Sequence, residues 1–238
     1  MNLRTCILIL ACLVFKLSSA QQIEVKYNRN KISNAVNNNA VSQEYTLIYS
    51  NGISLFQEDN SKTLAKIKKE MGNQEDLLSL DLSKKLFYYK NFNNNELISL
   101  LGEYQVKDSL INWNWKITEE VKDVAGYKCR KAVSSYQGYS FVAWYTEDIP
   151  INAGPEIYDG LPGLILQAYN LGYEYVASNI LISDKVINIA YPKISDKTYT
   201  FLAAQEELMK KLQAPGQTVE YKNDGDTSIK ITTKTFAD

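Results

Sequence analysis

The chain contains no histidine, and this absence excludes several catalytic and metal-binding arrangements. Without an imidazole, the chain can form neither Ser-His-Asp and Cys-His nucleophilic systems nor zinc and iron sites with histidine ligands. Cysteine is scarce as well, with 3 in 238 residues. We therefore expect no metal site and no cofactor, and we expect a protein that is not an enzyme of these classes.

A strong charge of either sign is also missing. The 26 basic and 27 acidic side chains give a net charge of −1. The basic stretches at residues 66–69 and 210–211 stand beside glutamates, a pattern typical of solvated helix faces. A nucleic-acid surface needs clustered basic side chains on one face, so we expect no nucleic-acid partner.

No apolar run is long enough to span a membrane. The longest one, residues 6–15, follows Arg4 and precedes Lys16 and the small residues 18–20, whereas a spanning helix needs about 20 apolar residues. This pattern predicts a secretory signal peptide over residues 1–20, and hence an exported protein, periplasmic or secreted, that is not an integral membrane protein. A retained membrane helix and lipid attachment at Cys12 are the alternatives, and the second would place the protein at the outer membrane.

The remaining chain, residues 21–238, shows no linker and is expected to form a single β-rich domain. Asn51-Gly52 between two β-prone runs predicts a hairpin. Further strands are expected at residues 86–90, 97–105, 113–121, 127–135, 139–146, 164–169, 173–182 and 228–236. Short turns separate most of them, which favours an antiparallel meander.

Two stretches have the periodicity of amphipathic helices, residues 61–71 and 198–213. In the second, Phe201, Ala204 and Leu208 line one face, and Leu202 and Met209 widen it. The expected fold class is mainly β (α+β): a curved antiparallel sheet or half-barrel with one or two covering helices.

Aromatic residues are plentiful, with 17 tyrosines and 3 tryptophans. Residues 139–146 are apolar on both faces of the expected strand, which is typical of a sheet covered on both sides. One face could line a cavity, or these rings could be ordinary core. The candidates for a pocket or an interface are Tyr88, Tyr89, Trp113, Trp115, Trp144, Tyr145, Tyr158, Tyr169, Tyr173 and Tyr175.

Cys129 is the one cysteine left after signal removal, and it is a possible reactive thiol. Its neighbours Lys128, Arg130 and Lys131 could lower the pKa of the thiol. Alternation along a strand sends Lys128 and Arg130 to the face opposite Cys129, which favours a half-buried structural cysteine.

Acidic pairs are present without a recognisable catalytic partner. Glu147 with Asp148, and Glu156 with Asp159, could supply a glycosidase-like acid and base, but that chemistry depends on a separation in space. A carboxylate-dependent hydrolase is therefore the lesser alternative among the functions considered below.

Residues 160–166 read Gly-Leu-Pro-Gly-Leu-Ile-Leu, the most distinctive segment of the chain. Pro162 and Gly163 predict a type II turn in which Gly163 takes a positive φ, followed by a buried strand over residues 164–166. Upstream segments lead into this heptad in a fixed order: residues 115–117, 126–132 and 143–151, then Gly154-Pro155.

These segments together resemble the GLPGLI family of exported proteins from Gram-negative bacteria, and they span about residues 113–170. The residues that carry the family motif are Gly160, Leu161, Pro162, Gly163, Leu164 and Ile165. The resemblance implies no catalytic residues, because the family has no assigned activity. A weaker resemblance, of fold alone, is to the half-barrel of periplasmic lipoprotein carriers.

The expected function is a non-catalytic binding module for a lipid or another apolar or amphipathic ligand in the cell envelope. The alternative is a structural protein that docks an envelope partner through the loop at residues 150–163. The candidate binding residues are Trp144, Tyr145, Pro155, Tyr158, Leu161 and Pro162.

Overall fold

A computed structural model describes residues 22–32, 43–59, 86–169, 172–184 and 186–213, together with the backbone of residues 218–222 and 228–232. The expected signal peptide, Cys12 and the expected helix at residues 61–71 lie outside these ranges. Within them, no helix has both the length and the apolar character that crossing a membrane requires.

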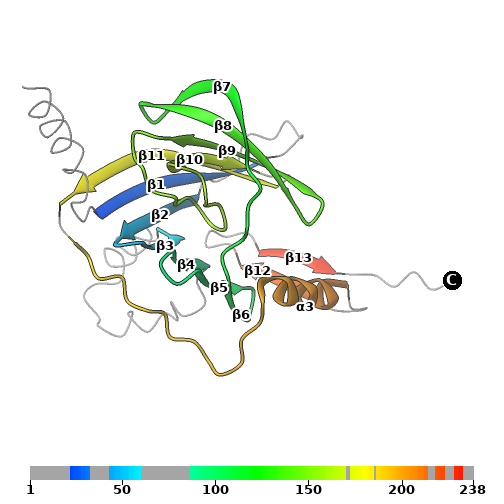
Figure 1. Ribbon diagram of the computed structural model, residues 1–238. Helices are drawn as coiled ribbons and strands as arrows, with labels where there is room; N and C mark the ends of the chain where they lie inside the picture. The colour runs from blue at the N-terminus through cyan, green and yellow to red at the C-terminus, as the bar shows by residue number, and fades with distance from the viewer. Residues whose placement is uncertain are drawn as a thin grey trace, which may run out of the picture.

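Eleven strands form one antiparallel sheet, which is the main body of the protein (Figure 1). They are β1 (Gln22–Lys31), β2 (Gln43–Ser50), β3 (Ile53–Glu58), β4 (Phe87–Asn91), β5 (Glu96–Leu101), β6 (Tyr104–Asp108), β7 (Lys116–Val124), β8 (Tyr127–Tyr136), β9 (Tyr139–Thr146), β10 (Leu164–Tyr169) and β11 (Tyr173–Ser183). A separate hairpin contains β12 (Thr218–Lys222) and β13 (Ser228–Thr232). The mainly β, antiparallel architecture expected from the sequence is thereby confirmed.

The sheet consists of two meanders, β1 to β6 and β7 to β11, joined where β1 pairs with β11. Strands β6 and β7 are therefore at opposite ends of the sheet, although only residues 109–115 connect them. A flat sheet of 11 strands would be about 48 Å wide, whereas this connection reaches about 28 Å when fully extended. The sheet must curl, and residues 109–115 cross the face that curls inward, here called the inner face.

The turns follow the sequence in some places and depart from it in others. Asn51 and Gly52 have φ values of 52° and 75° and form the expected hairpin turn between β2 and β3. The expected single strand at residues 97–105 is wrong: Gly102, with φ of 62°, turns the chain between β5 and β6. Strand β1 was missed, and β7 begins after the two tryptophans rather than at Trp113.

The single helix in the described residues, α3 (Phe201–Gln213), lies at the edge of the sheet formed by β5 and β6. Thr200 caps it, since its Oγ1 accepts a hydrogen bond from Ala203 N at 3.2 Å. Phe201 is buried, but Leu202 and Met209 are 49% and 50% exposed and do not widen the packed face as expected. The helix covers an edge instead of a whole face.

Irregular chain covers part of the other face. Ile189 packs on Tyr89 and Ile98 in a small second core, with Ile194 against its margin. Residues 186–200 thus lie against this outer face before the chain enters α3 (Figure 1). A parallel bridge between Val106 and Tyr199 then fixes the start of the helix. This path covers apolar side chains on the outer face of β2 to β5, among them Ile48, Leu55, Tyr89 and Ile98.

Candidate functional site

The loop between β9 and β10, residues 147–163, is held in shape by hydrogen bonds within its own backbone. Gly160 N donates to Asn152 O at 3.1 Å, and Tyr158 N donates to Pro155 O at 2.9 Å. Near its end, Ile165 N donates to Ala153 O at 3.0 Å. Because these bonds are internal to one segment, the loop has a defined shape of its own.

The glycines of the heptad have roles different from those expected. The positive φ of 79° belongs to Gly160, whereas Gly163 is outside the positive-φ region. A Cβ on Gly163 would lie 2.0 Å from Thr146 O, so what Gly163 provides is room for strand β9. The type II turn prediction at Gly163 is therefore wrong, while the buried strand over residues 164–166 is confirmed.

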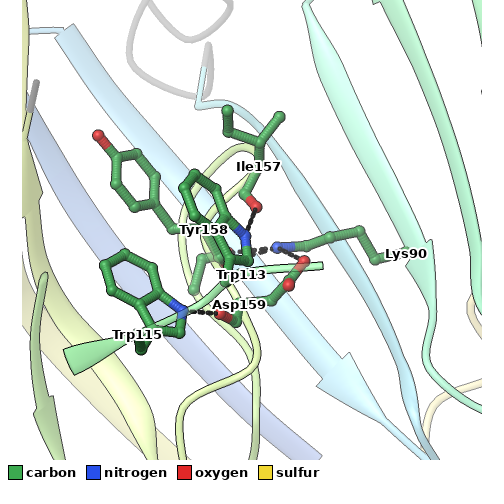
Figure 2. Close-up of polar contacts among 7 residues, drawn as sticks. Lys90, Trp113, Trp115, Ile157, Tyr158 and Asp159 are labelled. Atoms are coloured by element: carbon green, nitrogen blue, oxygen red, sulfur yellow. Dashed lines mark hydrogen bonds and ion pairs between the residues drawn. The ribbon is translucent and has the colours of Figure 1, made fainter. Parts of the chain in front are cut away.

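A buried ion pair fixes the loop to the sheet. Lys90, on β4, has a fully buried side chain whose Nζ lies 3.4 Å from Asp159 Oδ2. The same ammonium donates to Tyr158 O at 2.7 Å and to Gly154 O at 3.2 Å (Figure 2). One cation thus gathers three groups of the loop, and a buried ammonium with three acceptors is well matched to its donor capacity.

Burial acts on both members of this pair in the direction that opposes charge. It lowers the pKa of Lys90 and raises the pKa of Asp159, and in each case the charge of the partner works against that shift. Each charged group is therefore stabilised chiefly by the other. Removing one would leave the second buried without compensation.

Two tryptophans from the connection between β6 and β7 hold the same loop from its other side. Trp113 Nε1 donates to Ile157 O at 3.2 Å, and Trp115 Nε1 donates to Asp159 O at 2.8 Å (Figure 2). Their rings stack with centroids 4.9 Å apart, and the Trp113 ring also stacks on Tyr158 at 5.9 Å. The loop is consequently held between β4 and residues 113–115.

Next to this braced region is a cavity of about 380 Å³. Sheet, loop, the turn between β8 and β9, and helix α3 all contribute to its wall. The lining residues are Tyr88, Leu101, Tyr136, Gln137, Tyr139, Phe141, Glu156, Ile157, Phe201 and Gln205. Tyr139 is 57% exposed, so it stands at the mouth of the cavity.

Glu156 supplies the one formal charge among these lining residues. Its carboxylate accepts a hydrogen bond from the Tyr175 hydroxyl on β11. Burial raises the pKa of Glu156, while Tyr175, Arg29 and Lys90 oppose that shift. The wall of the cavity thus consists of five aromatic side chains, Leu101, Ile157 and two glutamines, with Glu156 as its single acidic group.

None of the candidate binding residues named from the sequence is among the residues that line this cavity. Tyr145, Tyr158, Leu161 and Pro155 are buried in the core, and Pro162 is exposed. Trp144 is buried beside Lys122, whose Nζ lies 4.1 Å from the centroid of the indole. Tyr158 contacts the lining directly, because its ring packs edge-on against that of Phe141 with the centroids 5.8 Å apart.

The loop at residues 150–163, the expected docking segment, is only partly exposed. Its exposed positions are Pro150, Asn152, Gly160 and Pro162, and much of the remainder is buried. The inward side of the loop is used to hold the fold together.

The surroundings of the candidate reactive groups do not favour reactivity. Cys129 is fully buried, and burial raises the pKa of its thiol to about 11, which disfavours the thiolate. Glu147 and Asp148 are exposed, and Glu147 pairs with Arg130 at 3.2 Å. In the ranges that the structure describes, no three acidic or cysteine side chains gather as a metal site would require.

Lys90 was missed by sequence reasoning, as were several cavity residues. A lysine in a short strand between Tyr89 and Asn91 looks like any edge-strand lysine, and its partner Asp159 is 69 positions away. The cavity wall combines residues from five separate segments. The available signal was local: Glu156 stood out as an acidic residue within a loop of glycines and prolines.

Comparison with known families finds one match, over residues 136–167, to a family described as "Protein of unknown function (Porph_ging)". This stretch runs from the end of β8 through the loop to β10 and contains the heptad. It also contributes six of the ten cavity residues, from Tyr136 to Ile157. The match does not carry the GLPGLI name; over this stretch the chain is similar to a family of unknown function.

Among solved structures, the chain is similar to PNGF-II in two crystal forms. One, in space group C2, is 19% identical with a TM-score of 0.51, and 87% of this chain covers 35% of that one. The other, in P21, is 21% identical with a TM-score of 0.52, with coverages of 86% and 35%. The chain therefore spans about a third of those proteins, and the likeness is one of fold.

Comparison with curated proteins finds no match. By its comparisons, then, this chain is similar in fold to one part of PNGF-II, and residues 136–167, which build the loop and the cavity, are similar to a family of unknown function.

Proposed function

We propose that the protein is a non-catalytic binding module that holds a small amphipathic ligand in the cavity beside Glu156. The observation that carries the proposal is the wall itself: in about 380 Å³, five aromatic side chains, two aliphatic side chains and two glutamines surround one carboxylate. Ligand sites are typically concave, mostly apolar and equipped with few polar groups, and this volume is near the lower end of their range.

The acidic residues support binding better than catalysis. A retaining or inverting hydrolase needs two carboxyl groups that face one substrate. Here Asp159 is held by Lys90, and Glu156 lines the cavity with Tyr175 as its hydrogen-bond donor. We therefore retain a hydrolase only as the lesser alternative.

We also propose that the protein acts after export, in the periplasm or outside the cell, with the segment at residues 1–20 removed. Amino-terminal sequencing of the protein recovered from cell envelope fractions tests this. A mature chain that starts near Gln21 is the expected result, and a chain that starts at Met1 would contradict it.

The binding proposal is tested by measuring the affinity of a neutral fluorescent hydrophobic probe, together with mass spectrometry of organic extracts from the purified native protein. Gln205→Trp, which places a large ring in the cavity wall, should abolish probe binding. Leu202→Trp is the matched control, because Leu202 lies on the same helix, is 49% exposed and is outside the cavity lining. Equal binding by the two variants would overturn the proposal.

A further inference from the structure

Glu156 has a backbone conformation that its own sequence does not favour. Its φ of 45° lies in the left-handed region, which is unfavourable for a residue with a Cβ. The neighbours impose this conformation: Lys90 Nζ holds Gly154 O and Tyr158 O, one on each side of Glu156. The buried lysine thereby fixes the position from which the carboxylate reaches the cavity.

The rest of the wall suits a positive charge. Five of the ten lining residues are aromatic: Tyr88, Tyr136, Tyr139, Phe141 and Phe201. The faces of aromatic rings attract cations, and rings gathered around one site are a recurrent way to bind alkylated ammonium groups. With Glu156 as the single formal charge of the lining, the wall offers nothing to balance an anionic ligand.

Two cations of the protein, Lys90 and Arg29, act on the charge of Glu156 but have other contact partners. Lys90 is held by Asp159 and two backbone carbonyls. The Arg29 guanidinium packs on two rings, 5.2 Å from the centroid of Tyr45 and 4.5 Å from that of Tyr173. Glu156 itself receives a hydrogen bond from a neutral phenol, so a bound cation would be its additional charged partner.

We propose that the ligand of this cavity is an organic cation, with an alkylated ammonium group placed between Glu156 and the rings of the wall. This inference rests on the proposed binding function and names its ligand class. A cavity of about 380 Å³ accommodates a head group with a short apolar body, and a longer body would leave past Tyr139 at the mouth.

The unmodified protein tests the proposal without any variant. Three compounds of similar shape are compared by ligand-observed NMR titration: benzyltrimethylammonium, its neutral isostere neopentylbenzene, and the anion 4-tert-butylbenzoate. We expect the cation to bind at least about tenfold more tightly than the neutral compound, as for other interactions with an ionised group. Equal or tighter binding of the neutral compound or of the anion would overturn the cation proposal and leave the binding function standing. If none of the three binds, and the neutral hydrophobic probe also fails, the binding function itself is wrong.

Substitution of the carboxylate provides a second, independent test. Glu156→Gln retains the shape of the side chain and an oxygen for the Tyr175 hydroxyl, and it should weaken benzyltrimethylammonium binding about tenfold while leaving neopentylbenzene unchanged. Glu147→Gln, on the same loop but 54% exposed and outside the lining, is the matched control and should bind as the unmodified protein does. Equal affinity of the two variants for the cation would refute the role of Glu156.

Discussion

Asp159 and Glu156 are three positions apart on one loop, and both are acidic residues that the fold draws inward, yet they differ in what they face. Asp159 meets the ammonium of Lys90 at 3.4 Å, and its own carbonyl is bonded by Trp115. Glu156 meets a phenol and lines a cavity. The first carboxylate is closed within the structure, and the second remains available to a ligand.

The contrast between Asp159 and Glu156 shows that burial of a charged group does not by itself indicate function. Burial raises the pKa of both carboxyl groups. Only the arrangement of partners separates them: the ammonium of Lys90 makes Asp159 a brace, and the adjoining cavity makes Glu156 a candidate ligand group. The two roles are linked, because the ammonium that holds Asp159 also holds the backbone on both sides of Glu156.

The largest expected effect comes from breaking the brace. Lys90→Met leaves Asp159 buried without its cation, and such a loss typically costs about 3–5 kcal/mol in the free energy of unfolding. Chemical denaturation followed by circular dichroism measures it. The double variant Lys90→Met with Asp159→Asn should recover part of the loss, because the uncompensated charge is gone. If the single and double variants were equally stable, the pair would not be the brace described here.

A smaller effect is expected from the tryptophan that supports the same carboxylate-bearing residue. Trp115→Phe keeps an aromatic ring but removes the 2.8 Å hydrogen bond to Asp159 O, worth roughly 0.5–1.5 kcal/mol. Trp144→Phe is the matched control, because its buried Nε1 has no hydrogen-bond partner among the described residues. Denaturation midpoints should fall further for Trp115→Phe, and a larger fall for Trp144→Phe would contradict the assignment.

The contribution of Glu156 to stability and to cation binding should depend on pH. The pKa of Glu156 is raised in the folded state. At pH values between the ordinary pKa of 4.5 and the raised pKa, the folded state therefore still holds a proton that the unfolded chain has released. As pH rises through this window, the unmodified protein should therefore lose stability relative to Glu156→Gln. Affinity for the cation should rise over the same interval, because the carboxylate is then ionised.

Most of the groups that face Glu156 do not titrate in the pH interval over which the stabilities of the unmodified protein and Glu156→Gln are compared. Burial raises the pKa of the four neighbouring tyrosines, and the pKa of Arg29 is raised as well, so these residues keep their protons across the interval; the tyrosines are Tyr45, Tyr88, Tyr158 and Tyr175. Lys90, whose pKa is lowered by burial, keeps Asp159 as its chief charged partner in both proteins, whereas its weaker interaction with Glu156 is absent from Glu156→Gln. Parallel denaturation curves from pH 4 to 7 supply the measurement. A difference that does not change with pH would show that Glu156 does not titrate as described.

The smallest effect is expected at Cys129. Its thiol is fully buried with a pKa of about 11, so a thiol-alkylating reagent at neutral pH should modify Cys129 only as fast as the fold opens. Lys90→Met should accelerate this labelling by about tenfold for each 1.4 kcal/mol of lost stability, because the rate follows the equilibrium constant for opening, and mass spectrometry follows the reaction. Fast labelling of the unmodified protein would instead restore Cys129 as a reactive thiol.

Several elements of the fold could be predicted because their signals are local. Asn51-Gly52 fixes a turn through two residues that tolerate positive φ, and Leu164–Tyr169 form a strand because a short apolar run follows a turn. The helix at residues 201–213 follows from apolar spacing that ends before Pro215. Each of these features depends on neighbours within a few positions.

The site could not be predicted in the same way. Trp144 and Tyr145 attracted attention as large aromatic residues, but side-chain alternation along β9 and the packing of whole elements decide which rings reach a cavity. Tyr88, Phe141 and Phe201 meet there because β4, β9 and α3 converge. No local pattern records that convergence.

The sequence alone is enough to establish which side chains are present and that the chain is mainly β. It contains no imidazole, has a near-neutral charge and many tyrosines, and carries one distinctive heptad. Only the tertiary structure decided that Lys90 would meet Asp159, that Gly163 was needed for space beside Thr146, and that Glu156 would line a cavity. The physical reason is that hydrogen bonds within turns and side-chain periodicity act over a few residues. Burial, charge pairing and cavity walls instead depend on segments that come together only when an 11-stranded sheet curls and the short connection between its two ends crosses the inner face.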